Sequence, residues 1–199
     1  MRANLDRELW RSGALVGGVD EAGRGALAGP VVAAAVVMPR DSLLAGVNDS
    51  KLLTPSARAR LDREIRERAL TWSVGLAGPR VIDRVNILNA ALEAMARAIR
   101  RLAPRPDVVL VDGPHAPRVD INCRPVVGGD RLSYNVACAS ILAKVHRDRL
   151  MARIDRRCPV YGFVRNKGYG TGEHLRALGS NGPSPFHRMS YAPVRECRV

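Results

Sequence analysis

Residues 18–36 read GVDEAGRGALAGPVVAAAV, in which two apolar runs flank a turn rich in glycine. The runs Leu15–Val19 and Val31–Met38 are rich in valine and alanine and are bounded by Gly and Pro. They are therefore predicted to be neighbouring strands, connected by residues 23–30. The second run is apolar throughout, which is typical of a strand that is covered on both faces.

Helices and further strands are predicted to follow along the chain. Thr54 and Pro55 suit the N-cap and first position of a helix, and Ser133 suits a second N-cap. The predicted elements are helices over 54–69, 86–102, 133–156 and near 173–178, and strands over 70–76, 108–111 and 124–127. Strands that come early and alternate with helices indicate the α/β class. A chain of 199 residues is expected to form one domain, with a core over about 14–157 and a C-terminal part of helices and loops.

The chain is strongly basic. It holds 32 Lys and Arg against 19 Asp and Glu, a formal net charge of +13. Such an excess favours a polyanionic partner such as nucleic acid, although an Arg-rich genome would produce it as well. Only 4% of residues are aromatic, so a stacking platform for bare single strands is poorly supplied. A hydrophobic fraction of 46% excludes general disorder.

Cysteine usage and apolar runs indicate a cytoplasmic protein. The four cysteines are widely spaced and form no C-x-x-C pair, so reduced thiols are expected rather than a zinc site or disulfides. The longest apolar run covers residues 31–38, far shorter than the ~20 residues that cross a bilayer. No signal peptide is expected, because the first residues include acidic side chains and no apolar run.

The adjacent carboxylates Asp20 and Glu21 come at the predicted end of the first strand. Burying them together would be costly unless they bind cations, but a solvated acidic turn accounts for the pair equally well. Asp112 ends another predicted strand, and Asp130 follows two glycines before the long helix, where it could also cap a turn. Acidic residues at neighbouring strand ends converge on one edge of an α/β sheet. Four carboxylates are the ligand set expected for one or two Mg²⁺ or Mn²⁺ ions, and two such ions suit phosphodiester hydrolysis.

Other polar segments suggest contacts to a nucleic acid. Gly23-Arg24-Gly25 lacks the spacing of a phosphate loop, but its bare backbone would let a ribose hydroxyl or phosphate approach closely. Lys51 could pair with a phosphate or a carboxylate, or lie in a surface turn. Tyr169 lies between two glycines, as if to present its ring to a sugar or base, although a tight turn would have the same pattern.

The helix over 133–156 carries a polar face. Ser140, Lys144 and Asp148 recur every four residues and so lie on one side of the helix. The face could look onto the nucleic acid or the carboxylates. The alternative is that Lys144 and Asp148 form only an ordinary helix ion pair.

Taken together, seven segments resemble the type 2 ribonucleases H, in particular the bacterial ribonuclease HII group. They are GVDEAGRGALAGPVVAAAV (18–36), DSK (49–51), VDG (111–113), GD (129–130), ASILAKVHRDRLM (139–151), NKGYGT (166–171) and FHR (186–188). Their order and spacing hold from about residue 17 to 194. Any one segment would be weak evidence, but seven in order are specific.

The resemblance implies an RNase H-like mixed sheet flanked by helices, with a C-terminal part over about 158–194 that contacts substrate. It implies Mg²⁺- or Mn²⁺-dependent cleavage of the RNA strand in RNA–DNA hybrids, including 5′ of single ribonucleotides in duplex DNA, with 5′-phosphomonoester products and a part in ribonucleotide excision repair. Carried over by position, the metal-binding catalytic residues would be Asp20, Glu21, Asp112 and Asp130. Gly23-Arg24-Gly25 would recognise the 2′-hydroxyl at the RNA–DNA junction, Tyr169 would stack on the adjacent deoxyribose, and Lys51 would lie near the phosphates.

The sequence departs from the usual pattern of this family at a few positions: Tyr134, Asn135, Cys138 and Phe186. None is a carboxylate, so packing adjustments are expected. No glutamine-led, double-aromatic motif supports tethering to a sliding clamp, and a monomer is expected. A non-enzymatic basic RNA-binding protein would explain the charge but not the four carboxylates. A resolvase-like or transposase-like nuclease on the same fold is the rival enzyme, because fold does not determine substrate.

Overall fold

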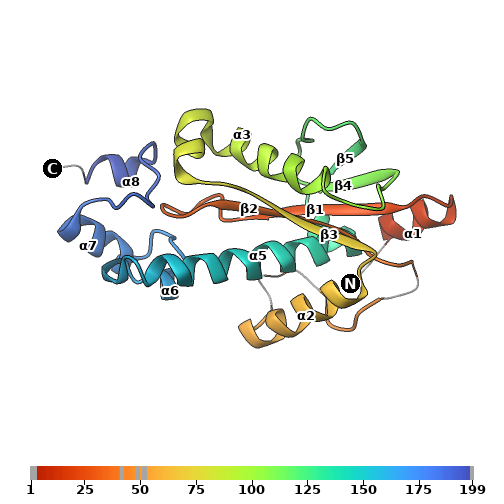
Figure 1. The fold of residues 1–199 in the computed structure, drawn as a ribbon, viewed down its shortest axis with the longest axis horizontal. Helices are drawn as coiled ribbons and strands as arrows, with labels where there is room; N and C mark the ends of the chain where they lie inside the picture. The colour runs from red at the N-terminus through yellow and green to blue at the C-terminus, as the bar shows by residue number, and fades with distance from the viewer. Residues whose placement is uncertain (1–3, 41–42, 48–49, 51–52, 198–199) are drawn as a thin grey trace.

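The computed structural model describes residues 4–40, 43–47, 50 and 53–197 and shows a mixed sheet with helices on both faces (Figure 1). The strands are β1 (Val16–Ala22), β2 (Val31–Val37), β3 (Thr71–Ala77), β4 (Val108–Asp112) and β5 (Asn122–Val126). Their order is β3-β2-β1-β4-β5, with β1, β2 and β3 antiparallel in succession and β4 parallel to both β1 and β5. The predicted α/β class and the mixed sheet with flanking helices are confirmed.

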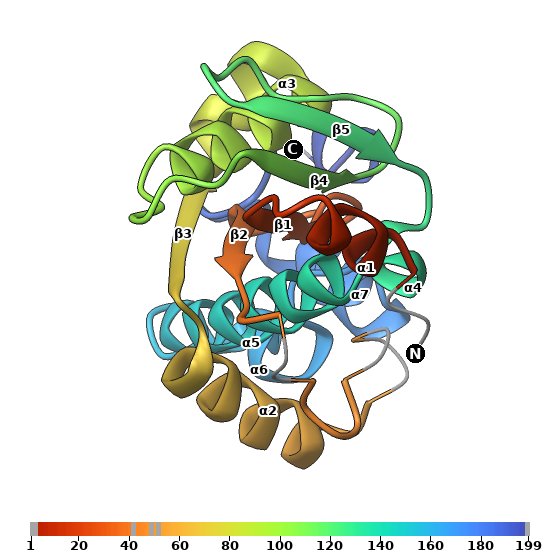
Figure 2. The ribbon, with the colours of Figure 1, turned by 90° about the vertical axis from the view of Figure 1, so that its right-hand side faces the viewer.

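Two long helices cover the two faces of the sheet. The helices are α1 (Asn4–Arg11), α2 (Pro55–Arg68), α3 (Pro79–Ile99), α4 (Gly129–Leu132), α5 (Tyr134–Asp155), the 3₁₀ turn η1 (Pro159–Tyr161), α6 (Phe163–Asn166), α7 (Gly172–Asn181) and α8 (Ala192–Arg195). Helix α3 packs on one face and α5 on the other, with α2 outside α5 (Figure 2). Helices α6, α7 and α8 gather at one end of the molecule (Figure 1). Within the described ranges no helix is long and apolar enough to cross a membrane.

Alternation along β1 divides the core into two layers. Val16 and Ala22 pack with α5, whereas Val19 packs with α3 on the opposite face. Glycine lets each helix approach the sheet closely. A Cβ on Gly18 would lie 2.2 Å from the carbonyl carbon of Asn135 in α5, and Gly75 meets α3 in the same way. These contacts bring α5 close to β1 and α3 close to β3.

The N-terminus of α5 is anchored by a residue of α1. The buried carboxylate of Asp6 accepts hydrogen bonds from the Ser133 hydroxyl (3.0 Å), the Tyr134 amide (2.7 Å) and the Asn135 side-chain amide (2.7 Å). Ser133 is also the predicted N-cap, accepting from the Val136 amide at 3.2 Å. Two departures from the family pattern, Tyr134 and Asn135, thus take part in packing and hydrogen bonding at this helix end.

Several predicted boundaries were wrong. Strand β1 extends three residues beyond Val19, so Asp20 and Glu21 belong to the strand and do not follow it. Helix α3 begins seven residues before Asn86, which has a left-handed φ of 65° and kinks the helix. Helix α1 was not predicted, and the tail holds α6 and α8 besides the expected α7. These short elements depend on tertiary contacts rather than on a long apolar period.

Candidate active site

Asp20 and Asp112 lie side by side on two inner strands of the sheet, at the point where the pairing of β1 with β4 ends. Strands β1 and β4 run parallel, and Val19 pairs with Val111, so the next residue of each strand is one of these aspartates. Asp112 Oδ1 accepts a hydrogen bond of 2.7 Å from the amide of Gly129, which places the first turn of α4 against the strand end. Asp130 is the next residue of α4 and is also buried. The predicted convergence of strand ends brings these segments together.

Asp20 is buried among polar groups from α5 and its own strand. Its Oδ1 accepts from the amide of Glu21 at 2.6 Å. Burial raises the pKa of Asp20 well above its usual value, and the charges of Glu21 and Asp112 raise it further, while a hydrogen bond with Ser140 acts in the opposite direction. Ser140 in turn shares a hydrogen bond of 2.8 Å with Ser50. A positive charge at this site would relieve the cost of ionised Asp20.

Glu21 is only partly neutralised. Its Oε1 lies 3.2 Å from Nη1 of Arg24, whereas Oε2 is buried and has no hydrogen-bond partner in the described part of the chain. Burial raises the pKa of Glu21, the Arg24 charge lowers it, and the Asp112 charge raises it. An unpartnered buried carboxylate oxygen is costly unless something satisfies it. Glu21 therefore has an oxygen suited to a cation.

These carboxylates fit a hard divalent cation in type, although they are not gathered as a finished ligand set. Among the described residues no three His, Cys, Asp or Glu side chains converge closely enough to hold a metal ion. Asp20 and Glu21 are neighbours on a strand and point to opposite faces, and the amide of Gly129 engages Asp112. The donors are all carboxylate oxygens that repel one another, and binding of Mg²⁺ or Mn²⁺ would draw them together.

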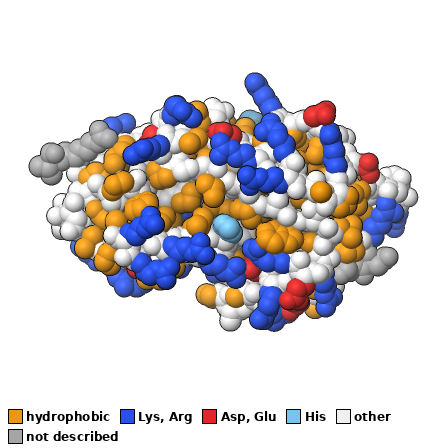
Figure 3. All heavy atoms as spheres, in the orientation of Figure 1, with side chains coloured by type: hydrophobic (Ala, Val, Ile, Leu, Met, Phe, Trp, Pro, Cys, Tyr) orange, Lys and Arg blue, Asp and Glu red, His pale blue; other side chains and the backbone are white. Residues whose placement is uncertain are grey.

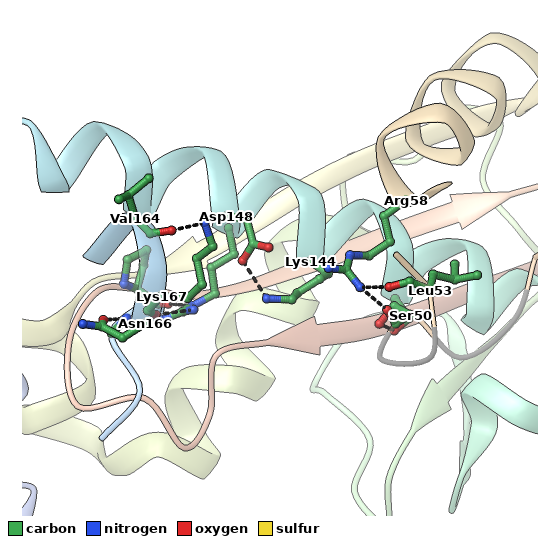
Figure 4. Close-up of polar contacts among 12 residues, drawn as sticks. Ser50, Leu53, Arg58, Lys144, Asp148, Val164, Asn166 and Lys167 are labelled. Atoms are coloured by element: carbon green, nitrogen blue, oxygen red, sulfur yellow. Dashed lines mark hydrogen bonds and ion pairs between the residues drawn. The ribbon is translucent and has the colours of Figure 1, made fainter. Parts of the chain in front are cut away.

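The polar face predicted on α5 has two parts. Ser140 faces Asp20, as described above. One turn farther on, Lys144 and Asp148 form an ion pair of 2.7 Å, with each side chain about one-fifth exposed (Figure 4). The structure thus shows the helix ion pair that was one of the two alternatives for these residues. Lys51 lies outside the described residues.

The segment that contains Gly23, Arg24 and Gly25 is held by a buried arginine from the C-terminal part. Arg188 is fully buried and donates from Nη2 to the Gly23 carbonyl (2.7 Å), from Nη1 to the Arg24 carbonyl (2.7 Å) and from Nε to the Gly29 carbonyl (3.0 Å). The Tyr191 hydroxyl donates to the Arg24 carbonyl as well, at 2.7 Å. The carbonyls of Gly23 and Arg24 therefore face the protein interior.

A second buried arginine, Arg147 of α5, supports the same segment. It donates to the carbonyls of Ala28 (3.1 Å), Pro30 (3.0 Å) and Lys167 (2.9 Å). Burial lowers its pKa to about 10, far above neutral pH, so the guanidinium stays charged. Arg147 thus joins residues 28–30 to the segment that leads to Tyr169.

The two glycines of this segment are not equivalent. Gly23 has a φ of +96°, and a Cβ there would lie 2.0 Å from Nε of Arg147. A Cβ on Gly25 would meet nothing within 4 Å. Gly23 is therefore required by the fold, whereas the open space beside Gly25 is available to a ligand.

Tyr169 is the exposed aromatic of the C-terminal part. The centroid of its ring lies 5.3 Å from Cζ of Arg147, and the residue is about two-fifths exposed. The amide of Leu27 donates to the Gly168 carbonyl at 2.8 Å, so the tyrosine is tied to the segment after Gly25. Its NH donates to the Asn166 carbonyl at 2.9 Å. Tyr169 and residues 23–25, which the sequence suggested as contacts to a nucleic acid, thus lie next to each other.

Sequence reasoning assigned no role to Arg147 or Arg188. Both lie inside motifs that were noted, HRDR and FHR, but no pattern in the sequence shows that an arginine is buried and bonded to main-chain carbonyls.

On the surface, Lys and Arg side chains are spread over much of the face in Figure 3, with Asp and Glu in a few places. This distribution agrees with the net charge of +13 and with an anionic partner.

Comparison with known proteins agrees with these features. The family model described as Ribonuclease HII matches residues 17–194. Ribonuclease HII of Syntrophomonas wolfei is 50% identical over 180 residues, which cover 90% of this chain and 71% of that protein. The crystal structure of ribonuclease H2 from Pyrococcus horikoshii superposes with a TM-score of 0.78 at 26% identity, covering 92% of this chain and 96% of that one.

The ribonuclease HII of Archaeoglobus fulgidus, solved in complex with PCNA, has a TM-score of 0.77 at 27% identity and covers 92% of this chain and 97% of that one. The mixed sheet is therefore the RNase H-like fold. On the strength of the sequence match over residues 17–194, this chain belongs to the ribonuclease HII family.

Proposed function

We propose that Asp20, Glu21, Asp112 and Asp130 carry out the activity of this family, endonucleolytic hydrolysis of the RNA strand in RNA–DNA hybrids. The observation that carries the proposal is the position of Asp20 and Asp112, each of which directly follows the last pair of the parallel β1–β4 ladder, Val19 and Val111. Beside them, Glu21 keeps one buried oxygen without a partner in the described residues. A purely structural role would not explain why repelling carboxylates, of which Asp20 and Asp130 are buried, are placed together.

The four carboxylates would hold one or two divalent cations, Mg²⁺ or Mn²⁺. When bound, such ions supply an activated water and neutralise charge on the attacked phosphate. Asp20 and Asp112 come from rigid strands, so their separation is set by the sheet. Ser140 orients Asp20, and the Gly129 amide orients Asp112. Arg24 balances part of the Glu21 charge and, being half exposed, can move to a phosphate.

Recognition of an RNA–DNA junction would belong to residues 23–25 and Tyr169. The open space beside Gly25 lets the backbone meet a 2′-hydroxyl, which is the group that distinguishes RNA from DNA. The exposed Tyr169 ring would then stack on the adjacent deoxyribose. Together they would allow cutting 5′ of a single ribonucleotide in duplex DNA. The basic surface adds affinity for any nucleic acid without selecting sequence.

Cleavage of three duplexes tests this function. One carries a single ribonucleotide in DNA, one is all DNA and one is all RNA, each with Mg²⁺, Mn²⁺ or EDTA. We expect cutting of the first duplex alone, 5′ of the ribonucleotide and only with metal. Equal cutting of all three would favour a general nuclease, and cutting in EDTA would contradict the metal role. The monomeric state, the cytoplasmic location and a part in repair stay predictions.

A further inference from the structure

A buried pair of histidines lies in the C-terminal part of the molecule. His174 lies in the first turn of α7 and His187 follows the turn at residues 184–186, and their Nε2 atoms are 3.0 Å apart. Both are almost fully buried. The rings of Tyr161 and Phe163 pack around them, with Tyr161 4.8 Å from His187 and Phe163 5.4 Å from His174 between ring centroids. Such a pair is not explained by the carboxylate site.

The hydrogen bonds determine where the protons are. The Ser184 amide can only donate, and it points at Nδ1 of His187 at 2.9 Å, so this nitrogen is unprotonated. Neutral His187 therefore carries its proton on Nε2 and donates to Nε2 of His174. His174 must then carry its proton on Nδ1, which lies 2.9 Å from the carbonyl oxygen of Tyr169. The chain of bonds is complete only when both histidines are neutral.

The end of this chain is the main chain of Tyr169. Its carbonyl accepts from His174 and also from the Thr171 amide at 2.8 Å, while its NH donates to Asn166. Asn166 Oδ1 accepts from the preceding amide, that of Gly168, at 2.7 Å. Tyr169 is thus held on both sides of its Cα, and these bonds set the direction of the Cα–Cβ bond from which its exposed side chain extends.

We propose that His174 and His187 form a neutral hydrogen-bonded pair in which each proton has a fixed position, and that this pair, called the relay below, positions Tyr169 for recognition of the RNA–DNA junction. They are positioning residues, because neither reaches the open side of the site. The inference rests on the proposed role of Tyr169. It adds that this role depends on a donor at Nδ1 of His174, supplied by a tautomer that His187 enforces.

The electrostatic surroundings favour the neutral pair. Burial lowers the pKa of both histidines, and the neighbouring His174 contributes to lowering the pKa of His187, to about 4. Tyr161 is the titratable side chain in ring contact with them in the described structure. Nearby, Arg165 and Glu173 pair with each other at the surface, and Arg188 directs its guanidinium to the carbonyls of residues 23, 24 and 29. A further proton on Nε2 of His174 would put two N–H groups face to face across the 3.0 Å contact, and one on Nδ1 of His187 would face the N–H of Ser184.

The relay is tested first in the unaltered protein. Nitrogen-15 NMR of histidine-labelled protein at pH 7 distinguishes protonated from unprotonated ring nitrogens. We expect His187 as the Nε2–H tautomer and His174 as the Nδ1–H tautomer. The opposite tautomers, or a charged ring, would overturn the inference whatever the variants do.

Two substitutions of His174 then separate positioning from packing. In His174→Asn the side-chain amide takes the place of Nδ1 and keeps a donor to Tyr169, whereas in His174→Gln it takes the place of Nε2 and loses that donor. His115→Gln, at an exposed histidine of the 113–118 segment, is the matched control. Cleavage is measured on a single-ribonucleotide duplex and on a long hybrid. Thermal unfolding of each variant is measured alongside.

We expect His174→Gln to lower single-ribonucleotide cleavage about tenfold more than hybrid cleavage, the scale of one lost hydrogen bond. His174→Asn and the control are expected to stay within about twofold of the unaltered protein, less than one such bond. Equal losses on both duplexes in His174→Gln and His174→Asn would mean a packing role and would overturn the inference. If Tyr169→Ala reduces the preference for the single ribonucleotide while His174→Gln does not, the relay fails and the proposed function stands. If Tyr169→Ala changes nothing, the proposed role of Tyr169 fails, and the NMR result still decides whether the relay exists.

Discussion

Arg188 donates a hydrogen bond of 2.7 Å from Nη2 to the main-chain carbonyl of Gly23, across 165 residues of sequence. The same guanidinium binds the carbonyls of Arg24 and Gly29, so the C-terminal part determines the conformation of the segment after β1. Because the carbonyls of Gly23 and Arg24 face the protein interior, the substrate would meet the outer side of this segment. One buried side chain thereby holds the backbone of the proposed recognition segment, which follows directly on the strand that carries the proposed catalytic residues Asp20 and Glu21.

Arg188→Lys should lower both stability and cleavage. A lysine keeps the charge but cannot reach the three carbonyls in the geometry of a guanidinium. The Tyr191 hydroxyl still bonds the Arg24 carbonyl, but each buried carbonyl left unpaired costs about 1–3 kcal/mol, so the free energy of unfolding should fall by at least about 1 kcal/mol. Urea unfolding and single-ribonucleotide cleavage measure the two effects. Arg63→Lys, at an exposed position of α2, is the control and should change neither.

Gly23→Ala and Gly25→Ala should separate fold from recognition. Alanine at Gly23 would place a Cβ 2.0 Å from Nε of Arg147 at a φ of +96°, so stability should fall by more than about 2 kcal/mol. Alanine at Gly25 meets nothing in the protein, and its stability should stay within about 0.5 kcal/mol. Gly25→Ala should nevertheless slow cutting at a ribonucleotide. Unchanged cleavage by Gly25→Ala would show that substrate does not approach there.

Asp20→Asn should abolish cleavage and yet stabilise the metal-free protein. Loss of a metal ligand should cost more than about a hundredfold in rate, because changes to residues that only support ligands already cost 10–100-fold. Folding raises the pKa of Asp20, so this carboxyl costs folding free energy as pH rises from its usual pKa through the raised one, and the neutral amide removes this cost. The checks are cleavage with Mg²⁺ and Mn²⁺, hybrid binding, and thermal unfolding in EDTA. Full activity would refute the metal role, and a lower unfolding midpoint would refute the electrostatic argument.

Stability should depend on pH through His187. Its pKa is lowered from 6.5 to about 4 in the folded protein, so the unfolded chain takes up a proton first as pH falls. The contribution of neutral His187 is therefore complete above pH 6.5 and declines as pH falls toward 4. The measurement is the difference in urea midpoint between the unaltered protein and His187→Gln at pH 4.5–7.5. The two curves should converge at acid pH, and a constant difference would contradict the shift.

Interactions between residues close in the sequence determine several strands, helices and helix caps of this protein. The apolar runs that became β1 and β2, the Thr54 and Ser133 caps and the long helix α5 follow from local periodicity and capping. The placing of Asp112 beside the first carboxylates also followed, because parallel strand ends share an edge. The motifs and their order were enough to indicate the family that the comparison shows.

Tertiary structure alone decided the rest. The partners that give a role to Arg147, Arg188 and the His174–His187 pair are distant in the chain or lie around a turn. Neither the charge of a residue nor its spacing from others predicts that its side chain will be buried and bonded to main-chain carbonyls. The difference between Gly23 and Gly25 is likewise invisible in sequence, since it depends on whether an arginine of α5 fills the space of a Cβ. Local pattern records what each residue prefers, whereas these roles depend on which atoms the folded chain brings within a few ångströms.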